Sequence, residues 1–246
     1  MAARVGMAQV QDPVEQILAA LNQTEVSPGR PAVTLSYAQS LDGSIAAARA
    51  FPLAISGVAS KKLTHRLRAA HDAILVGIGT VLSDDPLLTV REVSGKNPQP
   101  IVLDSRLRFP LGANLLQSSP PWIATRSPVN AGRAASLEKR GARVMEFPAD
   151  QDGRVSLPAV LDRLCKLGVR RLLVEGGAEV ITSFLAGRLV DYLVLTIAPA
   201  LVGGQPAAVK LLAGAGEAGL AGFPRLRELN SAHIGADLVV WGEMAR

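Results

Sequence analysis

The feature that most constrains the fold is a repeated alternation of short apolar runs with longer segments of helical periodicity. Eight runs have the length and the Val, Ile and Leu content of buried strands. They are Ala32–Tyr37, Ala73–Gly77, Pro100–Leu103, Trp122–Ala124, Ala142–Phe147, Arg171–Glu175, Tyr192–Ile197 and Asp237–Gly242. Strands that alternate with helices in this way usually build a parallel sheet. The sequence therefore predicts an α/β fold with a mostly parallel central sheet, flanked by helices on both faces.

Residues that start and stop helices mark four segments between these runs. Ser56 or Ser60 can cap a helix that reaches about His71. The other three are expected at Ala131–Arg140 before Gly141, from Ser156 to Gly168 with Pro158 in the first turn, and from Gly176-Gly177 to about Gly187. No convincing helix separates the last two apolar runs. We therefore expect these two strands to pair antiparallel, which makes the sheet mixed.

The first thirty residues differ from the rest of the chain. Asp12 is a suitable N-cap and Pro13 fits the first position of a short amphipathic helix over residues 12–22. The stretch TEVSPGRP that follows has the composition of a linker. We expect a helical appendage and linker at residues 1–30, packed on the surface or contacting a second subunit. Residues 31–246 are expected to form a single domain.

Composition narrows the classes of function. Every run of 18 residues with apolar character contains a charge, and the N-terminus lacks the apolar centre of a secretion signal, so we expect no membrane span. The single cysteine, Cys165, cannot form an internal disulfide, which favours a cytoplasmic protein. The net charge of +5 comes from scattered arginines, and only 4% of the residues are aromatic. This pattern argues against a nucleic-acid partner and suits a small anionic ligand such as a phosphate ester.

The stretch LLVEGGAEVITSFL combines a buried strand, a carboxylate and a pair of glycines before a helix. Two glycines let a ligand approach the backbone closely, and a helix N-terminus offers N–H groups to a phosphate. A tight strand–helix turn that merely needs glycine explains Gly176 and Gly177 equally well. Glu175 favours a functional site, because a carboxylate at the end of a core strand costs free energy unless it has a partner.

The stretch ILVGIGTVLSDDPLLTVR also ends a strand in small residues, here Gly77, Gly79 and Thr80, which predict a second close-approach turn. Asp84-Asp85-Pro86 can start a further turn, although one aspartate would be enough for that. Arg91 at the end of the stretch and Arg68 shortly before it could together bind an anion such as a sugar phosphate. Each arginine taken alone could equally be a solvated surface charge.

Other signals are weaker. Ala38-Gln39-Ser40 would offer a flat surface to a planar ring, but the Asp42-Gly43 that follows is a common turn signal. His65, His71 and His233 do not have the spacing of metal ligands, so no metal site is predicted. The stretch GIGTVL lacks the third glycine of a dinucleotide-binding fingerprint.

Five blocks in order along the chain resemble the pyrimidine reductases of riboflavin biosynthesis. They are SYAQSLDGSIA, LTHRLRAAHDAILVGIGTVLSDDPLLTVR, PIVLDSRLRFPL, LLVEGGAEVITSFL and LVDYLVLTIAPALVGG. The resemblance covers about Pro31 to Gly242 and makes residues 31–246 a reductase domain. It implies a dihydrofolate-reductase-like fold, NADPH as cofactor and a homodimer. The implied substrate is a pyrimidine with a ribosylamino 5′-phosphate, whose C1′ is reduced to give a ribitylamino chain.

The resemblance also implies roles for individual residues of this chain. The positions that match cofactor contacts are Ala38, Thr80, Asp84, Ser105, Gly176, Gly177, Ala178, Glu179, Val180 and Ile181. Those that match substrate contacts are Arg68, Leu88, Arg91 and Glu175. Asp84 and Glu175 are the candidates for catalytic acid or base. The residues themselves do not decide between the two carboxylates.

Two positions depart from the reductase domain of the bifunctional bacterial deaminase–reductases. That domain commonly has a lysine at the position of Ser36 and a cofactor-contacting tryptophan at the position of Ala54. Both departures resemble the stand-alone archaeal and fungal type, whose pyrimidine is not yet deaminated. The deaminated and the non-deaminated pyrimidine both stay candidates, as does NADH beside NADPH. A dihydrofolate-reductase-like paralogue with another substrate and a non-catalytic NADPH-binding module are the alternative functions.

Overall fold

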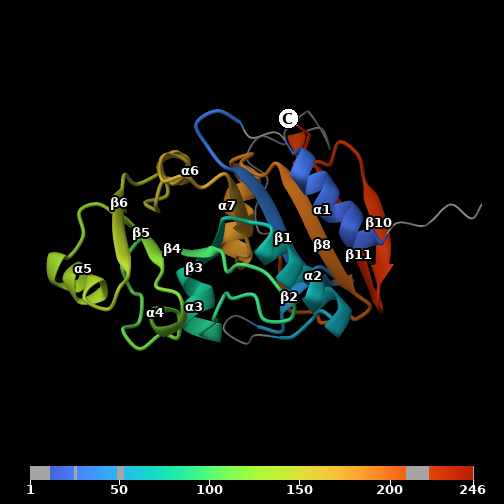
Figure 1. Ribbon diagram of the computed structural model, residues 1–246, viewed down its shortest axis with the longest axis horizontal. Helices are drawn as coiled ribbons and strands as arrows, with labels where there is room; N and C mark the ends of the chain where they lie inside the picture. Colours follow the sequence, from blue (N-terminus) through green and yellow to red (C-terminus); the bar gives the residue numbers. More distant parts are fainter. Residues whose placement is uncertain (1–11, 25–26, 49–52, 209–221, 246) are drawn as a thin grey trace, which may run out of the picture.

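The computed structural model describes residues 12–24, 27–48, 53–208 and 222–245, and a central sheet crosses the whole of this part (Figure 1). Its strand order is β10-β11-β8-β1-β7-β3-β4-β5-β6. The strands are β1 (Ala32–Ser40), β3 (Ala73–Gly77), β4 (Gln99–Leu103), β5 (Trp122–Arg126), β6 (Arg143–Phe147), β7 (Arg171–Val174), β8 (Tyr192–Ala198), β10 (Asn230–Ile234) and β11 (Asp237–Glu243). A separate small sheet pairs β2 (Ser44–Ala46) with β9 (Gln205–Pro206).

The predicted mixed, mostly parallel sheet is confirmed. The strands from β8 to β6 in this order run parallel, and β11 is antiparallel to both β8 and β10. All eight predicted strands are present. The sequence interpretation missed β10, whose residues NSAHI are mostly polar and exposed because it forms the edge of the sheet. It also missed the short pair β2 and β9.

Helices cover both faces of the sheet, as predicted. They are α1 (Pro13–Gln23), α2 (Val58–Ala69), α3 (Ile78–Asp84), α4 (Leu115–Ser118), α5 (Ala131–Glu138), α6 (Leu157–Lys166) and α7 (Ala178–Ala186). Side chains of α1 to α5 share one core cluster with alternate strand residues such as Ile74 and Val76. The helices α6 and α7 pack with Ala73 and Leu75 in the second cluster, on the opposite face. Figure 1 shows α1 and α2 in front of the sheet and α7 behind it.

The N-terminal helix α1 begins as predicted, with Asp12 accepting a hydrogen bond from Val14 N at 3.0 Å and proline in its first turn. Ile17 and Leu21 are buried in the same core cluster as α2. The helix is thus packed on the domain. The division of the chain at residue 30 stays a prediction. None of the helices in the described ranges combines the length and hydropathy needed to cross a bilayer.

Two local predictions were wrong. Neither Ser56 nor Ser60 caps α2, because Gly57 is the N-cap and makes no side-chain capping bond. Gly79 and Thr80 do not form a turn but lie in the first turns of α3. That helix ends at Asp84, and its C-cap residue Asp85 has a left-handed φ of 39°. The two glycines and the adjacent aspartates suggested a loop, whereas burial of Ile78 and Val81 stabilises a short helix.

Acid sensitivity is expected from His71, which lies buried just after α2. Its Nδ1 donates to Leu67 O at 2.6 Å and its Nε2 accepts from Thr34 Oγ1 at 2.8 Å. Burial lowers the pKa of His71 from 6.5 to about 4. Between these two pKa values the unfolded chain therefore binds a proton that the folded chain does not bind. The free energy of unfolding should fall by about 3 kcal/mol as the pH drops through this interval.

This expectation is checked by urea unfolding at a series of pH values in the wild type and in His71→Gln. The variant should lose the extra slope that His71 gives the wild type between its two pKa values. His233 lies exposed on β10, so His233→Gln should leave that slope unchanged. Equal slopes in the wild type and His71→Gln would contradict the assignment.

Candidate active site

The candidate site lies at the carboxyl edge of β7 and β3, the two central strands. Strand β7 sits between β1 and β3, although it follows both in sequence. The chain leaves β3 toward β4 and leaves β7 toward β8, so successive strands lead to opposite sides of this point. In open α/β sheets ligands bind where the strand order reverses in this way. Glu175, which directly follows β7, donates its backbone N–H to Leu75 O of β3 at 3.0 Å.

An ion pair between Arg68 of α2 and Glu175 is central to this edge. Arg68 Nε donates to Glu175 Oε1 at 2.9 Å and Nη2 donates to Oε2 at 2.7 Å. The two side chains are only 13% and 15% exposed. Burial alone would lower the pKa of Arg68, but the Glu175 carboxylate outweighs it and the net shift is upward. Glu175 thus has the partner that its position in the sequence required.

Arg68 also lines a pocket of about 350 Å³, which we call the arginine pocket. Its lining includes Lys61, Thr64, His65 and Arg68 of α2, with Arg91 and Glu92 from the extended segment after α3. That segment is tied to α2 at two points. Arg68 Nη1 donates to Thr89 O at 3.1 Å, and Arg91 N donates to His65 Nδ1 at 3.0 Å. The structure therefore brings the two predicted substrate arginines together.

The glycines around the start of α7 have different surroundings. A Cβ on Gly176 would lie 2.4 Å from Val180 Cβ, and one on Gly77 would lie 2.8 Å from Val180 Cγ2. Both positions need glycine because β3, β7 and α7 pack closely there. A Cβ on Gly177 would meet only Thr80 Oγ1, at 3.9 Å. Gly177 and Thr80 therefore face each other with open space beside them, and Gly177, the N-cap of α7, makes no side-chain capping bond.

Gly176→Ala is expected to lower the free energy of unfolding by about 1–3 kcal/mol, because the added methyl group overlaps Val180. Gly177→Ala is the matched control on the next residue and should change stability far less. Chemical denaturation of both variants checks the difference. Equal stabilities would show that Val180 can move aside and that packing does not require Gly176.

The remaining predicted residues lie around these groups without direct contacts to the ion pair. Asp84 is exposed, one helical turn from Thr80 on α3, and its Oδ1 accepts from Ser83 Oγ at 2.5 Å. Leu88 is buried with a left-handed φ of 52°. Ser105 follows β4, and its Oγ accepts from Val155 N at 3.0 Å. Ala38 pairs with Thr196 between β1 and β8.

The arginine pocket itself does not contain all the predicted groups. Arg68 and Arg91 line it, whereas Thr80 and Gly177 form a neighbouring surface. The two parts are connected through Glu175, which binds Arg68 and precedes the glycine pair. A ligand with an anionic end in the pocket could thus reach the surface at Gly177.

Sequence reasoning missed the polar face of α2. Thr64 and His65 both lie three or four residues from Lys61 and from Arg68, so the four residues lie along one side of the helix. That spacing was a usable signal. Histidines were considered only as metal ligands, which left His65 unassigned. Burial first, and then the charges of Arg68 and Arg91, lower the pKa of His65.

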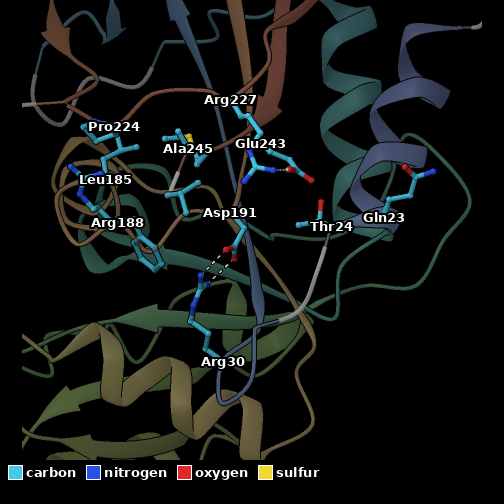
Figure 2. A pocket seen from close by; sticks show the side chains of 13 residues that line it. Gln23, Thr24, Arg30, Leu185, Arg188, Asp191, Pro224, Arg227, Glu243 and Ala245 are labelled. Carbon is cyan, nitrogen blue, oxygen red and sulfur yellow. Dashed lines mark hydrogen bonds and ion pairs between the residues drawn. The ribbon is translucent and has the colours of Figure 1, made fainter. Parts of the chain in front are cut away.

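A larger hollow of about 560 Å³ lies at the opposite, amino edge of the sheet (Figure 2). Four of its charged groups form two ion pairs. Arg30 binds Asp191 through two bonds of 2.7 and 2.6 Å, and Arg227 lies 3.7 Å from Glu243. Asp191 also accepts from Val33 N at 2.8 Å. These contacts join the start of β1 to the start of β8, so we interpret the ion pair of Arg30 and Asp191 as structural.

Known proteins are similar in sequence to this chain over most of its length. A 2,5-diamino-6-ribosylamino-4(3H)-pyrimidinone 5′-phosphate reductase of Archaeoglobus fulgidus is 41% identical over 188 residues, which is 72% of this chain and 84% of that protein. The protein of the same name from Methanothermobacter thermautotrophicus is 40% identical over 215 residues, which is 86% of this chain and 97% of that one.

Solved structures share the fold. Rib7, the riboflavin biosynthesis reductase of Saccharomyces cerevisiae, is 26% identical with a TM-score of 0.72, covering 94% of this chain and 97% of that one. RibD of Acinetobacter baumannii matches with a TM-score of 0.71 and 27% identity, over 89% of this chain but only 59% of that longer one. Dihydrofolate reductase of Enterococcus faecalis, complexed with NADP(H), is 12% identical with a TM-score of 0.51, over 89% of this chain and 99% of that one.

The dihydrofolate-reductase-like fold that the resemblance implied is thereby confirmed. The family model described as the RibD C-terminal domain matches residues 31–240. That range contains the ion pair of Arg68 and Glu175, the arginine pocket and the glycines before α7. The chain therefore belongs to the family of the RibD C-terminal domain, whose archaeal and fungal relatives are pyrimidinone phosphate reductases of riboflavin biosynthesis.

Proposed function

We propose that this protein reduces the ribosylamino side chain of 2,5-diamino-6-ribosylamino-4(3H)-pyrimidinone 5′-phosphate to a ribitylamino chain, with NADPH as the reductant. The two archaeal relatives at about 40% identity carry the name of this reductase. The observation that carries the proposal is the ion pair of Arg68 and Glu175. It joins a cationic pocket suited to a sugar phosphate to a glycine turn suited to a dinucleotide.

The arginine pocket would hold the 5′-phosphate. The Arg68 guanidinium lines this pocket and stays positively charged, although two of its nitrogens donate to Glu175. Arg91 and Lys61 are exposed cations on two sides of the same pocket. Arginine and lysine bind phosphate through charge-assisted hydrogen bonds. The bond from Arg68 to Thr89 O keeps the segment that carries Arg91 beside α2. Positioning of the sugar phosphate would then orient the reacting C1′ relative to the edge of the sheet.

The residues at the start of α7 fit a dinucleotide. The open side of Gly177 faces Thr80, and the uncapped first turn of α7 can donate N–H groups to a pyrophosphate. The proposed contacts of NADPH are Thr80, Asp84, Ser105, Ala38 and the residues from Gly176 to Ile181. NADPH, when bound, would supply the hydride that C1′ receives.

Asp84 is a better candidate than Glu175 for the residue that donates the proton. Reduction of the open-chain imine adds a hydride to C1′ and a proton to the attached nitrogen. Both carboxylate oxygens of Glu175 are already bound by Arg68, so Glu175 is better suited to orient that arginine. Asp84 is exposed and lies on the same side of α3 as Thr80, where it could exchange a proton with substrate or solvent.

The test follows NADPH absorbance with the diaminopyrimidinone phosphate and with 5-amino-6-(5-phosphoribosylamino)uracil, side by side. We expect turnover of the diaminopyrimidinone and a loss on the order of a hundredfold or more in kcat for Asp84→Asn, with little loss of stability. Tight NADPH binding without turnover of either pyrimidine would favour a non-catalytic module. Turnover of dihydrofolate alone would favour a paralogue with another substrate.

The homodimer, the cytoplasmic location and the division of the chain at residue 30 belong to the same proposal. Light scattering of the purified protein tests the dimer. NADH offered in place of NADPH tests the choice of cofactor.

A further inference from the structure

His65 occupies a position in the arginine pocket that neither the resemblance nor the fold assigns to a function. It lies on α2 between Thr64 and Arg68 and is only 6% exposed. Its Nδ1 accepts the backbone N–H of Arg91 at 3.0 Å. Because Nδ1 is an acceptor, the proton of the neutral ring must be on Nε2.

The Nε2–H group has no hydrogen-bond acceptor among the described residues. None of the described residues accepts a hydrogen bond from it, and the buried polar atoms without partners in the described ranges are Asp104 Oδ1 and Thr125 Oγ1. Nε2 is therefore not sealed inside the core. Since His65 lines the arginine pocket, its remaining donor is available to a ligand there.

Burial, and then the charges of Arg68 and Arg91, favour the neutral ring and outweigh the opposite effect of Glu92 and Glu175. Lys61 and Arg68 lie on its own helix, Arg91 and Glu92 on the segment packed against it, and Glu175 at the end of β7. Protonation of Nδ1 would set it against the N–H of Arg91, with two donors facing each other. A neutral ring keeps that bond and still offers one N–H to an anion.

We propose that His65 both binds the ligand and positions Arg91 in the phosphate site. Its Nδ1 holds the Arg91 segment against α2, and its Nε2–H donates to a phosphate oxygen of the ligand. Together with the bond from Arg68 to Thr89 O, this gives the segment two attachments to one helix. The two arginines are then presented to the same hollow at a fixed separation. This inference rests on the proposed function only for the identity of the complete substrate.

Two variants separate the two roles. The side-chain oxygen of asparagine can reproduce the acceptor at Nδ1 but has no group at the position of Nε2, whereas the amide of glutamine reaches that position. In His65→Asn we expect unchanged thermal stability and a Kd for ribose 5-phosphate raised about tenfold or more, as for loss of a hydrogen bond to a charged group. His65→Gln should recover part of that affinity while its stability falls. His233→Asn, on exposed β10, is the control and should change neither.

The binding experiment uses calorimetry on the full chain with ribose 5-phosphate, and nitrogen NMR of the histidine rings reports the tautomer. At pH 7 His65 should be neutral with its proton on Nε2, and ribose 5-phosphate should shift the Nε2 resonance. A ring protonated on Nδ1, or wild-type affinity in His65→Asn, would overturn the proposal.

The outcomes for His65 and for the proposed function are distinguishable. If ribose 5-phosphate binding depends on His65 but neither pyrimidine is reduced, the phosphate site stands and the proposed reaction fails. If the diaminopyrimidinone is reduced and His65→Asn has the wild-type KM, the reaction stands and the role of His65 fails. With both correct, His65→Asn should raise KM much more than it lowers kcat.

Discussion

Replacing Arg68 by methionine is expected to lower kcat/KM on the order of a hundred- to a thousandfold. Truncating one partner of a buried, hydrogen-bonded charge pair costs about 2–5 kcal/mol, and each 1.4 kcal/mol is about a factor of ten. Arg68 makes three hydrogen bonds, two to Glu175 and one to Thr89 O, and it lines the arginine pocket. Its loss removes a phosphate ligand, frees Glu175 and releases the Arg91 segment together.

Steady-state kinetics with the phosphorylated substrate measures the loss, and Arg66→Met is the matched control. Arg66 lies on the same helix, but its ion pair with Glu15 is exposed, with side chains 39% and 57% accessible. That variant should stay within about twofold of the wild type, because exposed ion pairs contribute little. Arg68→Lys should fall between the two, since lysine keeps the charge but cannot reproduce the bidentate fork.

A double variant separates activity from stability. Arg68→Met leaves the largely buried Glu175 carboxylate without its cation, which also destabilises the fold. Adding Glu175→Gln removes that charge, so the double variant should regain stability without regaining activity. Restored activity in the double variant would mean that Arg68 serves the fold and not the ligand.

Asp191→Asn is expected to lower the free energy of unfolding by about 3 kcal/mol, a shift of roughly 10 °C in Tm for a chain of this size. Asp191 is 7% exposed and Arg30 22% exposed, so the variant leaves a largely buried guanidinium without its anion. Asparagine can still accept the Val33 N–H, which limits the change to the ion pair. Because this pair lies at the amino edge of the sheet, kcat/KM of the folded fraction should stay close to the wild type.

Asp162→Asn provides the comparison. Its pair with Lys166 on α6 is exposed, with side chains 50% and 65% accessible, and should contribute at most about 0.5 kcal/mol. Thermal unfolding of both variants, with activity assayed below the transition, tests the contrast. A similar small shift in Tm for both variants would mean that water solvates the Arg30 guanidinium when Asp191 is neutralised. A loss of activity in folded Asp191→Asn would connect the amino edge to the active site.

Local patterns in the sequence were enough to predict most elements. The eight apolar runs became strands because short runs rich in Val, Ile and Leu favour the buried strand conformation. The cap of α1 at Asp12 and the start of α7 after two glycines were also visible, since capping involves residues within one turn. Edge strand β10 and short helix α3 were missed, because their residues lack a strong local preference.

The amino-acid sequence by itself determined the α/β class, the glycine turn before α7 and the family, because each follows from patterns inside short segments and from their order along the chain. Only the tertiary structure decided that β7 lies between β1 and β3. That placement brings Glu175 to Arg68, 107 residues earlier, and α2 brings His65 to the backbone of Arg91. Such contacts follow from how helices and strands pack, and hydrophobic periodicity reports that a face is buried but not which side chains it meets.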